Sequence, residues 1–266
     1  MDAMLSTLVT CLNHAALSGT NVIPWSCPVP SFGDLSRSIV ATLGLNPSNR
    51  EFVDDSGNEL DGASRRFHTL KSLGLSRWAD ANARHLQLII DSCRAYFRRN
   101  PYDGWFKKLD HIISGTKASY YSASAKACHL DLIPYATACK WTALSRLQRT
   151  SLLAAADDTL GLLLRDSPVR VLILNGNSVV EQFQDIAGIR LRKQAMRDWS
   201  LPRYSHSGVT GFAYKGTVRD ISGVRLEREV LVLGFNHNIQ SSFGVTTQVT
   251  AAIRRWIARC ADEAFS

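Results

Sequence analysis

Polar side chains follow four apolar runs of the sequence, each at the point where the run ends. Asn46 comes directly after the first run, Asp131 lies near the end of the second, and Asn236 and His237 follow the fourth. The third run ends at 175–178, Asn-Gly-Asn-Ser, which suits a tight strand-to-helix turn. Amide, carboxylate and imidazole groups can hold a water molecule and exchange hydrogen bonds with a polar ligand. If the runs are parallel strands, these side chains converge at one edge of the sheet, where ligands bind.

The apolar runs have the composition of buried parallel strands. Each is rich in Val, Ile or Leu and lacks in-out alternation, as expected when helices cover both faces of a sheet. Patterns with helical spacing lie between and after them. We therefore predict an α/β fold, a three-layer αβα sandwich around a four-stranded, mainly parallel sheet. The predicted strands are 38–45, 127–133, 169–174 and 230–235, and the predicted helices are 78–97, 152–164 with Thr150 and Ser151 as caps, and 249–264.

Length and composition indicate a single domain over residues 1–266. With 45% hydrophobic and 20% charged residues, the chain can bury a core and lacks the signature of disorder. The segment 188–228 is rich in Arg, Lys and Gly. We interpret it as a basic insertion, and both a hairpin and a solvated surface excursion fit its composition.

The charge favours a polyanionic partner. Lys and Arg outnumber Asp and Glu by 31 to 23, a net charge of +8, which fits a protein that binds nucleic acid. The six cysteines are scattered without the spacing of a zinc site, so we expect no metal and no other cofactor. The start lacks a basic signal region, and two aspartates interrupt the most apolar later run. We expect a monomeric, cytoplasmic protein that binds no membrane.

The pentapeptide at 44–48, Gly-Leu-Asn-Pro-Ser, resembles the first motif of the uracil-DNA glycosylase superfamily, a strand-terminal Gly-x-(Asp/Asn)-Pro. Members with Asn in this motif act on mismatched or single-stranded bases. Residues 63–70, ASRRFHTL, are similar to the Asn-Arg-Phe segment of the mismatch-specific branch. Residues 171–183 resemble the third strand with its glycine turn, and 236–242, NHNIQSS, stand in place of the closing His-Pro-Ser-type loop. The likeness extends in strand order over residues 37–258.

The resemblance implies a DNA glycosylase that hydrolyses the N-glycosidic bond of a flipped-out base and leaves an abasic site. The base departs as an anion while positive charge develops on the sugar, after it has been drawn out of the stack. Asn46 would position the water. His237 would donate to the departing base, or Asn236 would, because the last loop lacks the family proline and the alignment can shift by one residue. Phe52 would stack on the base, at about 1–3 kcal/mol; the alternative is that its ring fills the core.

Asp131 departs from the family pattern, which places Asn at the end of this strand. A carboxylate cannot donate to O4 of uracil, so it favours the exocyclic amine of a cytosine-type base. The N3 atom of cytosine is an acceptor, so a second donor or a protonated Asp131 would complete the pairing. The alternative is that Asp131 caps the turn before Pro134.

Ordinary cytosine fills the host genome, so the expected target is a modified cytosine. Some bacterial members of the superfamily excise glucosylated hydroxymethylcytosine in defence against phages, and the resemblance implies this role. The alternatives are a uracil or mismatch repair glycosylase, and a catalytically weak DNA-binding module on the same fold. The expected DNA contacts, with Arg side chains on phosphates and Gln240 as a wedge, are Pro47, Ser48, Arg65, Arg66, Lys140, Gln240, Ser241 and Ser242.

Overall fold

The computed structural model describes residues 2–14, 17–99, 103–124, 126–201, 208–240 and 244–265. The fold is α/β, with a six-stranded sheet in the order β2-β1-β3-β6-β5-β4. Strands β1, β2, β3 and β6 are parallel, whereas β5 pairs antiparallel with both β6 and β4. The strands are β1 Ser38–Gly44, β2 Lys126–Asp131, β3 Val171–Asn175, β4 Arg192–Leu201, β5 Val209–Ile221 and β6 Val224–Phe235.

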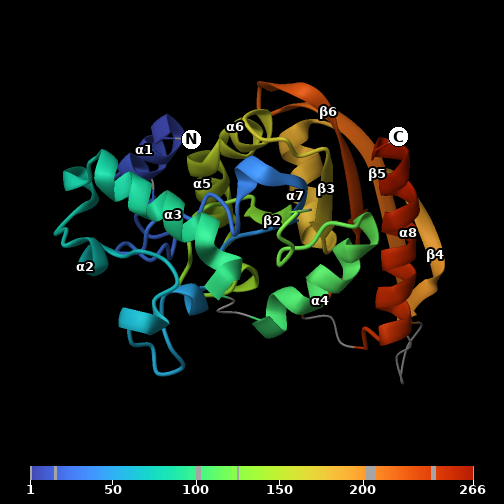
Figure 1. Cartoon of the computed structure of the whole chain (residues 1–266), viewed down its shortest axis with the longest axis horizontal. Coiled ribbons are helices and arrows are strands. Elements are labelled where there is room, and N and C mark those ends of the chain that lie inside the picture. Colours follow the sequence, from blue (N-terminus) through green and yellow to red (C-terminus); the bar gives the residue numbers. More distant parts are fainter. Residues whose placement is uncertain are drawn as a thin grey trace.

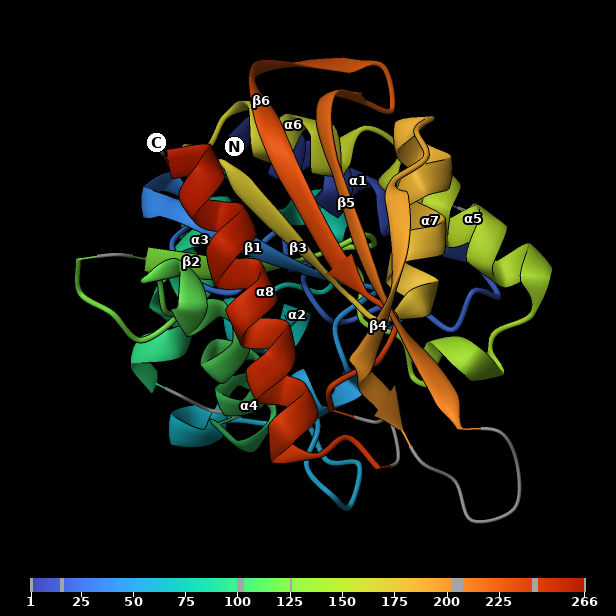
Figure 2. The ribbon, with the colours of Figure 1, turned by 90° about the vertical axis from the view of Figure 1, so that its right-hand side faces the viewer.

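Helices cover both faces of the sheet, which makes the three layers of the predicted sandwich. Helices α4 and α8 lie on one face, and α5, α6 and α7 lie on the other (Figures 1 and 2). The helices are α1 Asp2–Cys11, α2 Leu70–Leu73, α3 Ala83–Arg99, α4 Asp103–Ile113, α5 Arg146–Ala156, α6 Thr159–Arg165, α7 Asn177–Ala187 and α8 Thr247–Phe265.

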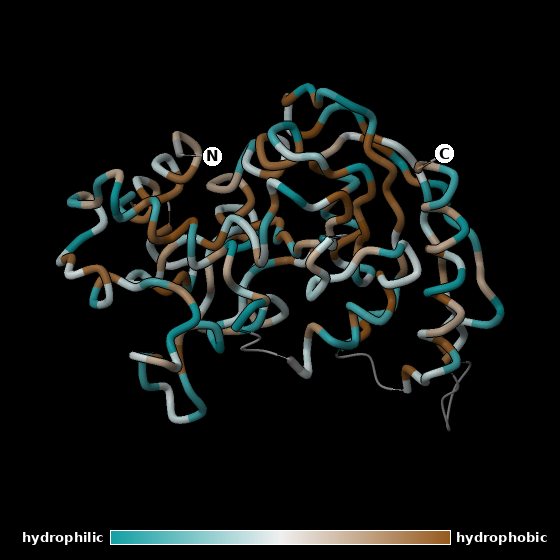
Figure 3. The backbone as a smooth tube through the Cα atoms, viewed as in Figure 1, coloured by the Kyte–Doolittle hydropathy of each residue, from teal (hydrophilic) through white to brown (hydrophobic). Residues whose placement is uncertain are grey.

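Each face of the sheet has its own hydrophobic core. Successive residues of a strand point to opposite faces, so Ile173 belongs to the core under α8 while its neighbours Leu172 and Leu174 belong to the core under α7. Apolar segments therefore gather in the central strands (Figure 3). The parallel arrangement of the four apolar runs is confirmed, and they correspond to β1, β2, β3 and β6.

The prediction of a four-stranded sheet is wrong, because the segment 188–228 supplies two further strands. It contains β4, β5 and the start of β6, and it extends the sheet instead of projecting from it. The hairpin interpretation applies to β4 and β5, which pair antiparallel. The charged residues are tolerated because β4 is an edge strand: Arg192, Lys193 and Arg197 are exposed, while Trp199 is buried against α8.

The predicted helix 152–164 is two helices. Helix α5 ends at Ala156, because the next residue, Asp157, has a φ of 34° that is incompatible with a continuing helix, and α6 follows. Helix α5 begins earlier than predicted, because Ser145 and Gln148 form a capping box in place of Thr150 and Ser151. The predicted helix 78–97 corresponds to α3, which starts at Ala83 after a short 3-10 turn.

The outer side of β2 is covered by the segment that precedes β1. Phe32 forms two backbone hydrogen bonds with His129, N to O at 2.8 Å and O to N at 2.9 Å. Further along, the backbone N of Val29 donates to the carbonyl of Pro134 at 2.7 Å. The strand that ends at Asp131 is therefore paired on both sides, which holds its side chains in fixed positions.

Candidate functional site

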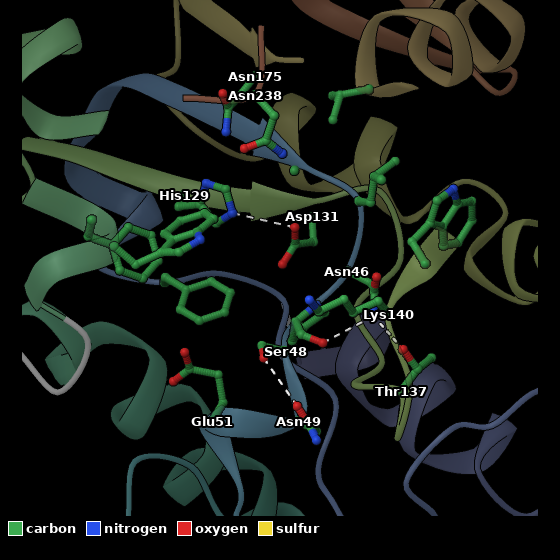
Figure 4. A pocket seen from close by; sticks show the side chains of 18 of the residues that line it. Asn46, Ser48, Asn49, Glu51, His129, Asp131, Thr137, Lys140, Asn175 and Asn238 are labelled. Atoms are coloured by element: carbon green, nitrogen blue, oxygen red, sulfur yellow. Dashed lines mark hydrogen bonds and ion pairs between the residues drawn. The ribbon is translucent and has the colours of Figure 1, made fainter. Parts of the chain in front are cut away.

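A cavity of about 350 Å³ lies at the carboxyl ends of the parallel strands. Each of the four parallel strands contributes one polar residue to its wall: Asn46 follows β1, Asp131 ends β2, Asn175 ends β3 and Asn238 follows β6. Figure 4 shows these four side chains around one hollow. The carboxyl ends of the four strands meet at one cavity as predicted, but the fourth contributes Asn238 and neither Asn236 nor His237. The volume falls in the range of about 300–1,000 Å³ that is typical of small-ligand sites.

Asn46 is held by its own amide group. Its Nδ2 donates to Thr137 Oγ1 at 2.9 Å and to the carbonyl of Pro47 at 3.1 Å, and the Thr137 hydroxyl donates onward to the carbonyl of Cys139 at 2.7 Å. These bonds use both amide hydrogens. Asn46 Oδ1 is then the atom that can accept a hydrogen bond from a water molecule in the cavity.

Asp131 and His129 form a buried pair on the same face of β2. They are two residues apart, and His129 Nε2 lies 3.4 Å from Asp131 Oδ1. Gly44 sits opposite Asp131 in the register of β1, and a Cβ atom there would overlap Asp131 Oδ1 and contact His129 Nε2. Gly44 therefore makes room for the pair. His129 is a buried residue, as expected for a core histidine, but it also lines the cavity.

Glu51 is a second carboxyl group in the cavity wall, and no motif in the sequence marks it as a site residue. It is only 2% exposed. Tyr96 donates to its Oε2 at 2.9 Å, and Arg66 Nη1 lies 3.6 Å from the same oxygen. Burial raises the pKa of Glu51 from 4.5 to about 7, against the opposing effects of Arg66 and Tyr96, and the nearby charge of Asp131 adds to the rise.

The raised pKa of Glu51 predicts a pH-dependent stability. Below about pH 4.5 the carboxyl group is protonated in both the folded and the unfolded chain, and its stabilising contribution is fully present. As the pH rises through about 7 this contribution is lost, at a cost of up to about 3 kcal/mol in the free energy of unfolding. Glu51→Gln should flatten this dependence in urea unfolding at a series of pH values. Glu227→Gln, at an exposed ion pair with Arg228, serves as the control. An unchanged slope in Glu51→Gln would contradict the assignment.

Phe52 does not reach the cavity. Its ring is 1% exposed and packs against Phe67 and Trp25, with centroids 5.8 and 6.3 Å away. The expectation that it stacks on a ligand is therefore corrected in favour of the core-filling alternative. The aromatic part of the wall comes instead from Phe32, Phe106 and Trp105. Of these only Trp105 is half-buried, so its ring can present a face to a ligand.

The structure brings neither His237 nor Asn236 to the cavity wall. His237 is 2% exposed, its Nε2 donates to the carbonyl of Trp199 at 2.7 Å, and burial lowers its pKa. Asn236 binds β5 through both ends of its amide, accepting from the backbone N of Phe212 and donating to the carbonyl of Thr210, each at 2.8 Å. The residue of this loop that lines the cavity is Asn238.

The expected DNA contacts are placed unevenly. Pro47, Ser48 and Lys140 line the cavity, and Lys140 is exposed. The other described members of the set, Arg65, Arg66 and Gln240, do not line it. Ser241 and Ser242 lie outside the described residues.

Of the three expected DNA contacts that do not line the cavity, Arg66 and Gln240 are placed by side-chain contacts within the chain. Arg66 donates to the carbonyl of Arg50 at 2.8 Å and supports Glu51. Arg65 is half-buried, and Gln240 Oε1 accepts from Asn175 at 2.7 Å. Arg66 and Gln240 therefore contact residues of the cavity wall, Glu51 and Asn175 respectively, without lining the cavity themselves.

Comparison with known proteins assigns no family. No protein-family model matches the chain, and no curated protein matches it. Within the described ranges, no group of three or more His, Cys, Asp or Glu residues could hold a metal ion, and no helix is both long and apolar enough to cross a bilayer. The site must therefore be interpreted from its own chemistry.

Proposed function

We propose that this protein is a DNA glycosylase that hydrolyses the N-glycosidic bond of a flipped-out, amine-bearing pyrimidine. The observation that carries the proposal is the position of Asn46 and Asp131 on one cavity at the ends of adjacent strands, one suited to hold water and the other to accept from a base. The resemblance of residues 44–48 to the first motif of the uracil-DNA glycosylase superfamily and the net charge of +8 support the same assignment.

In the proposed reaction, water held by Asn46 Oδ1 adds to C1′ of the deoxyribose. The C1′–N bond breaks, its electron pair leaves with the base, and a proton from the water ends on the departing base. An amide cannot remove a proton, so the rate depends on positioning and on stabilising the leaving group. Asn238 takes the leaving-group contact first expected of His237, because it brings an amide from the same loop to the cavity.

A cytosine-type base fits the wall better than uracil. Asp131 offers an acceptor to an exocyclic amine, whereas O4 of uracil needs a donor. The cavity volume of about 350 Å³ leaves room for a substituent on the base. We therefore extend the proposal to modified cytosines, including glucosylated hydroxymethylcytosine, and to a role in anti-phage defence.

The proposal is tested with DNAs that carry uracil, hydroxymethylcytosine or its glucosylated form. We expect alkali-labile abasic sites and release of a cytosine-type base, identified by mass. Borohydride should trap no imine, since the proposed nucleophile is water. Binding to all three DNAs without base release would favour the second candidate, a catalytically weak DNA-binding module, which the lack of a proton acceptor in Asn46 also supports.

The two aromatic positions give a further prediction. Phe52→Leu should lower the free energy of unfolding by about 1–2 kcal/mol, less than the about 3–5 kcal/mol typical of full truncation, and should leave kcat for base release unchanged. Trp105→Ala should weaken binding of the flipped base by about 1–3 kcal/mol, as expected for loss of a stacking ring. Urea unfolding and single-turnover kinetics separate the two effects. A loss of activity in Phe52→Leu at unchanged stability would reverse the assignment.

A further inference from the structure

A chain of buried polar contacts, two hydrogen bonds and one nitrogen–oxygen contact, ends at Asp131. The hydroxyl of Tyr120 lies 2.5 Å from Thr42 Oγ1, and Thr42 Oγ1 lies 2.7 Å from His129 Nδ1. The opposite ring nitrogen, His129 Nε2, lies 3.4 Å from Asp131 Oδ1. The register of the sheet builds this chain, because Thr42 of β1 pairs with His129 of β2 and Gly44 pairs with Asp131. Only the last two links, His129 and Asp131, line the cavity.

The direction of the chain follows from its buried end. Burial raises the pKa of Tyr120 well above its ordinary value, so its hydroxyl keeps its hydrogen. In the described part of the chain, Thr42 Oγ1 is the acceptor within reach of that hydrogen, and a buried hydroxyl left unpaired is costly. Tyr120 therefore donates to Thr42. The single hydrogen of Thr42 is then directed to His129 Nδ1, which must be the unprotonated nitrogen.

With Nδ1 unprotonated, the ring hydrogen of His129 lies on Nε2, which is 3.4 Å from Asp131 Oδ1. The surroundings of the ring favour this single arrangement. Phe32, Trp105 and Phe106 surround it, with ring centroids 5.4, 5.4 and 5.3 Å away, and none of the three offers an acceptor. In the described part of the chain, Asp131 Oδ1 is therefore the acceptor that faces this hydrogen. Its second oxygen points away from His129 into the hollow, on the side where Ser48 and Glu51 lie (Figure 4).

We infer that Tyr120, Thr42 and His129 are positioning residues that hold Asp131 as a hydrogen-bond acceptor and thereby restrict the site to bases with an exocyclic amine. This inference rests on the proposed function for its substrate class. If the hydrogen bonds ran in the opposite direction, His129 Nδ1 would donate to Thr42 and His129 Nε2 would face Asp131 with a lone pair. The carboxyl group of Asp131 would then need a proton to donate to Nε2. A protonated carboxyl group is a hydrogen-bond donor, so it would donate to O4 of a uracil-type base.

The first experiment does not depend on enzymatic activity. Nitrogen-15 NMR of the histidine rings distinguishes the Nε2–H from the Nδ1–H tautomer, and His129→Gln identifies the His129 signals by their loss. In the wild-type protein at neutral pH we expect the Nε2–H tautomer for His129. The Nδ1–H tautomer would overturn the inference, whether or not the protein proves to be a glycosylase.

The second experiment measures specificity. Thr42→Val keeps the shape of the side chain and removes the link, and Tyr120→Phe removes only the first donor. Thr159→Val, at another buried threonine on α6, is the matched control. The readout is the ratio of kcat/KM on DNA with hydroxymethylcytosine to that with hydroxymethyluracil. We expect the ratio to fall at least about tenfold in Thr42→Val, less in Tyr120→Phe, and not at all in the control.

A purely structural role gives a different result. It would lower kcat/KM on both DNAs equally and leave the ratio unchanged, and this outcome would overturn the inference. If the wild-type protein releases no base from any DNA, the proposed function fails, and the NMR result still decides whether the chain holds Asp131 as an acceptor.

Discussion

Replacing Asn46 with alanine is expected to lower kcat for base release at least about 100-fold, because misplacing a reactant by about 1 Å can cost that much. The amide of Asn46 is fixed by Thr137 and by the carbonyl of Pro47, which leaves Oδ1 to hold the water. Binding of the duplex depends mainly on phosphate contacts, so DNA affinity should change little. Single-turnover kinetics and fluorescence anisotropy measure the two quantities separately.

The matched control is Asn58→Ala, at an exposed turn where Asn58 binds Asp54. It should leave both kcat and DNA affinity at wild-type values. An Asn46→Ala variant that releases base at the wild-type rate would exclude Asn46 from the reaction. An equal loss of DNA affinity and activity would instead indicate that Asn46 acts in binding alone.

The second large effect is expected from Asp131→Asn, which should reverse the base preference. The substitution preserves shape, and the amide oxygen can still accept from His129 Nε2, 3.4 Å away in the wild type. The amide nitrogen then takes the place of the carboxylate oxygen that faces the cavity, and it donates where the wild type accepts. Each base contact of this kind discriminates by about 1–3 kcal/mol. Release of a cytosine-type base should therefore fall by about 10- to 100-fold, while release of uracil should rise.

Competition between two oligonucleotides, one with hydroxymethylcytosine and one with hydroxymethyluracil, measures this preference directly. Asp80→Asn, at an exposed ion pair with Arg77, is the control and should not alter it. If Asp131→Asn retains the wild-type preference, Asp131 does not contact the base. The turn-capping alternative would then stand.

The positions of the strand ends were predictable from the sequence, because a strand buried on both faces of a sheet is a continuous apolar run. Runs of Val, Ile and Leu without alternation indicate parallel strands, and parallel strands place their carboxyl ends at one edge. Asn46 and Asp131 could therefore be assigned to one site. His129 could have been included by the same reasoning, since it precedes Asp131 by two residues and shares its face of β2.

The loop residues could not be predicted, because their direction depends on turn geometry. Asn236, His237 and Asn238 are consecutive, yet they bind β5, bind β4 and line the cavity respectively. Nothing in their types distinguishes these three environments. Glu51 was missed because a buried glutamate is rare without a partner. Its partners, Arg66 and Tyr96, lie 15 and 45 positions further along the chain, so only the folded structure brings them together.

The covered edge of β2 affects how this site could change during evolution. Because Phe32 pairs with His129 on one side and β1 pairs on the other, the groups that we propose select the ligand belong to a rigid scaffold and not to an adaptable loop. A rigid scaffold holds catalytic geometry more accurately than a loop does. New ligand selectivity should therefore arise through single substitutions at Asp131 or at the residues that position it. Insertions in the surrounding loops would alter access to the cavity and leave the choice of ligand intact.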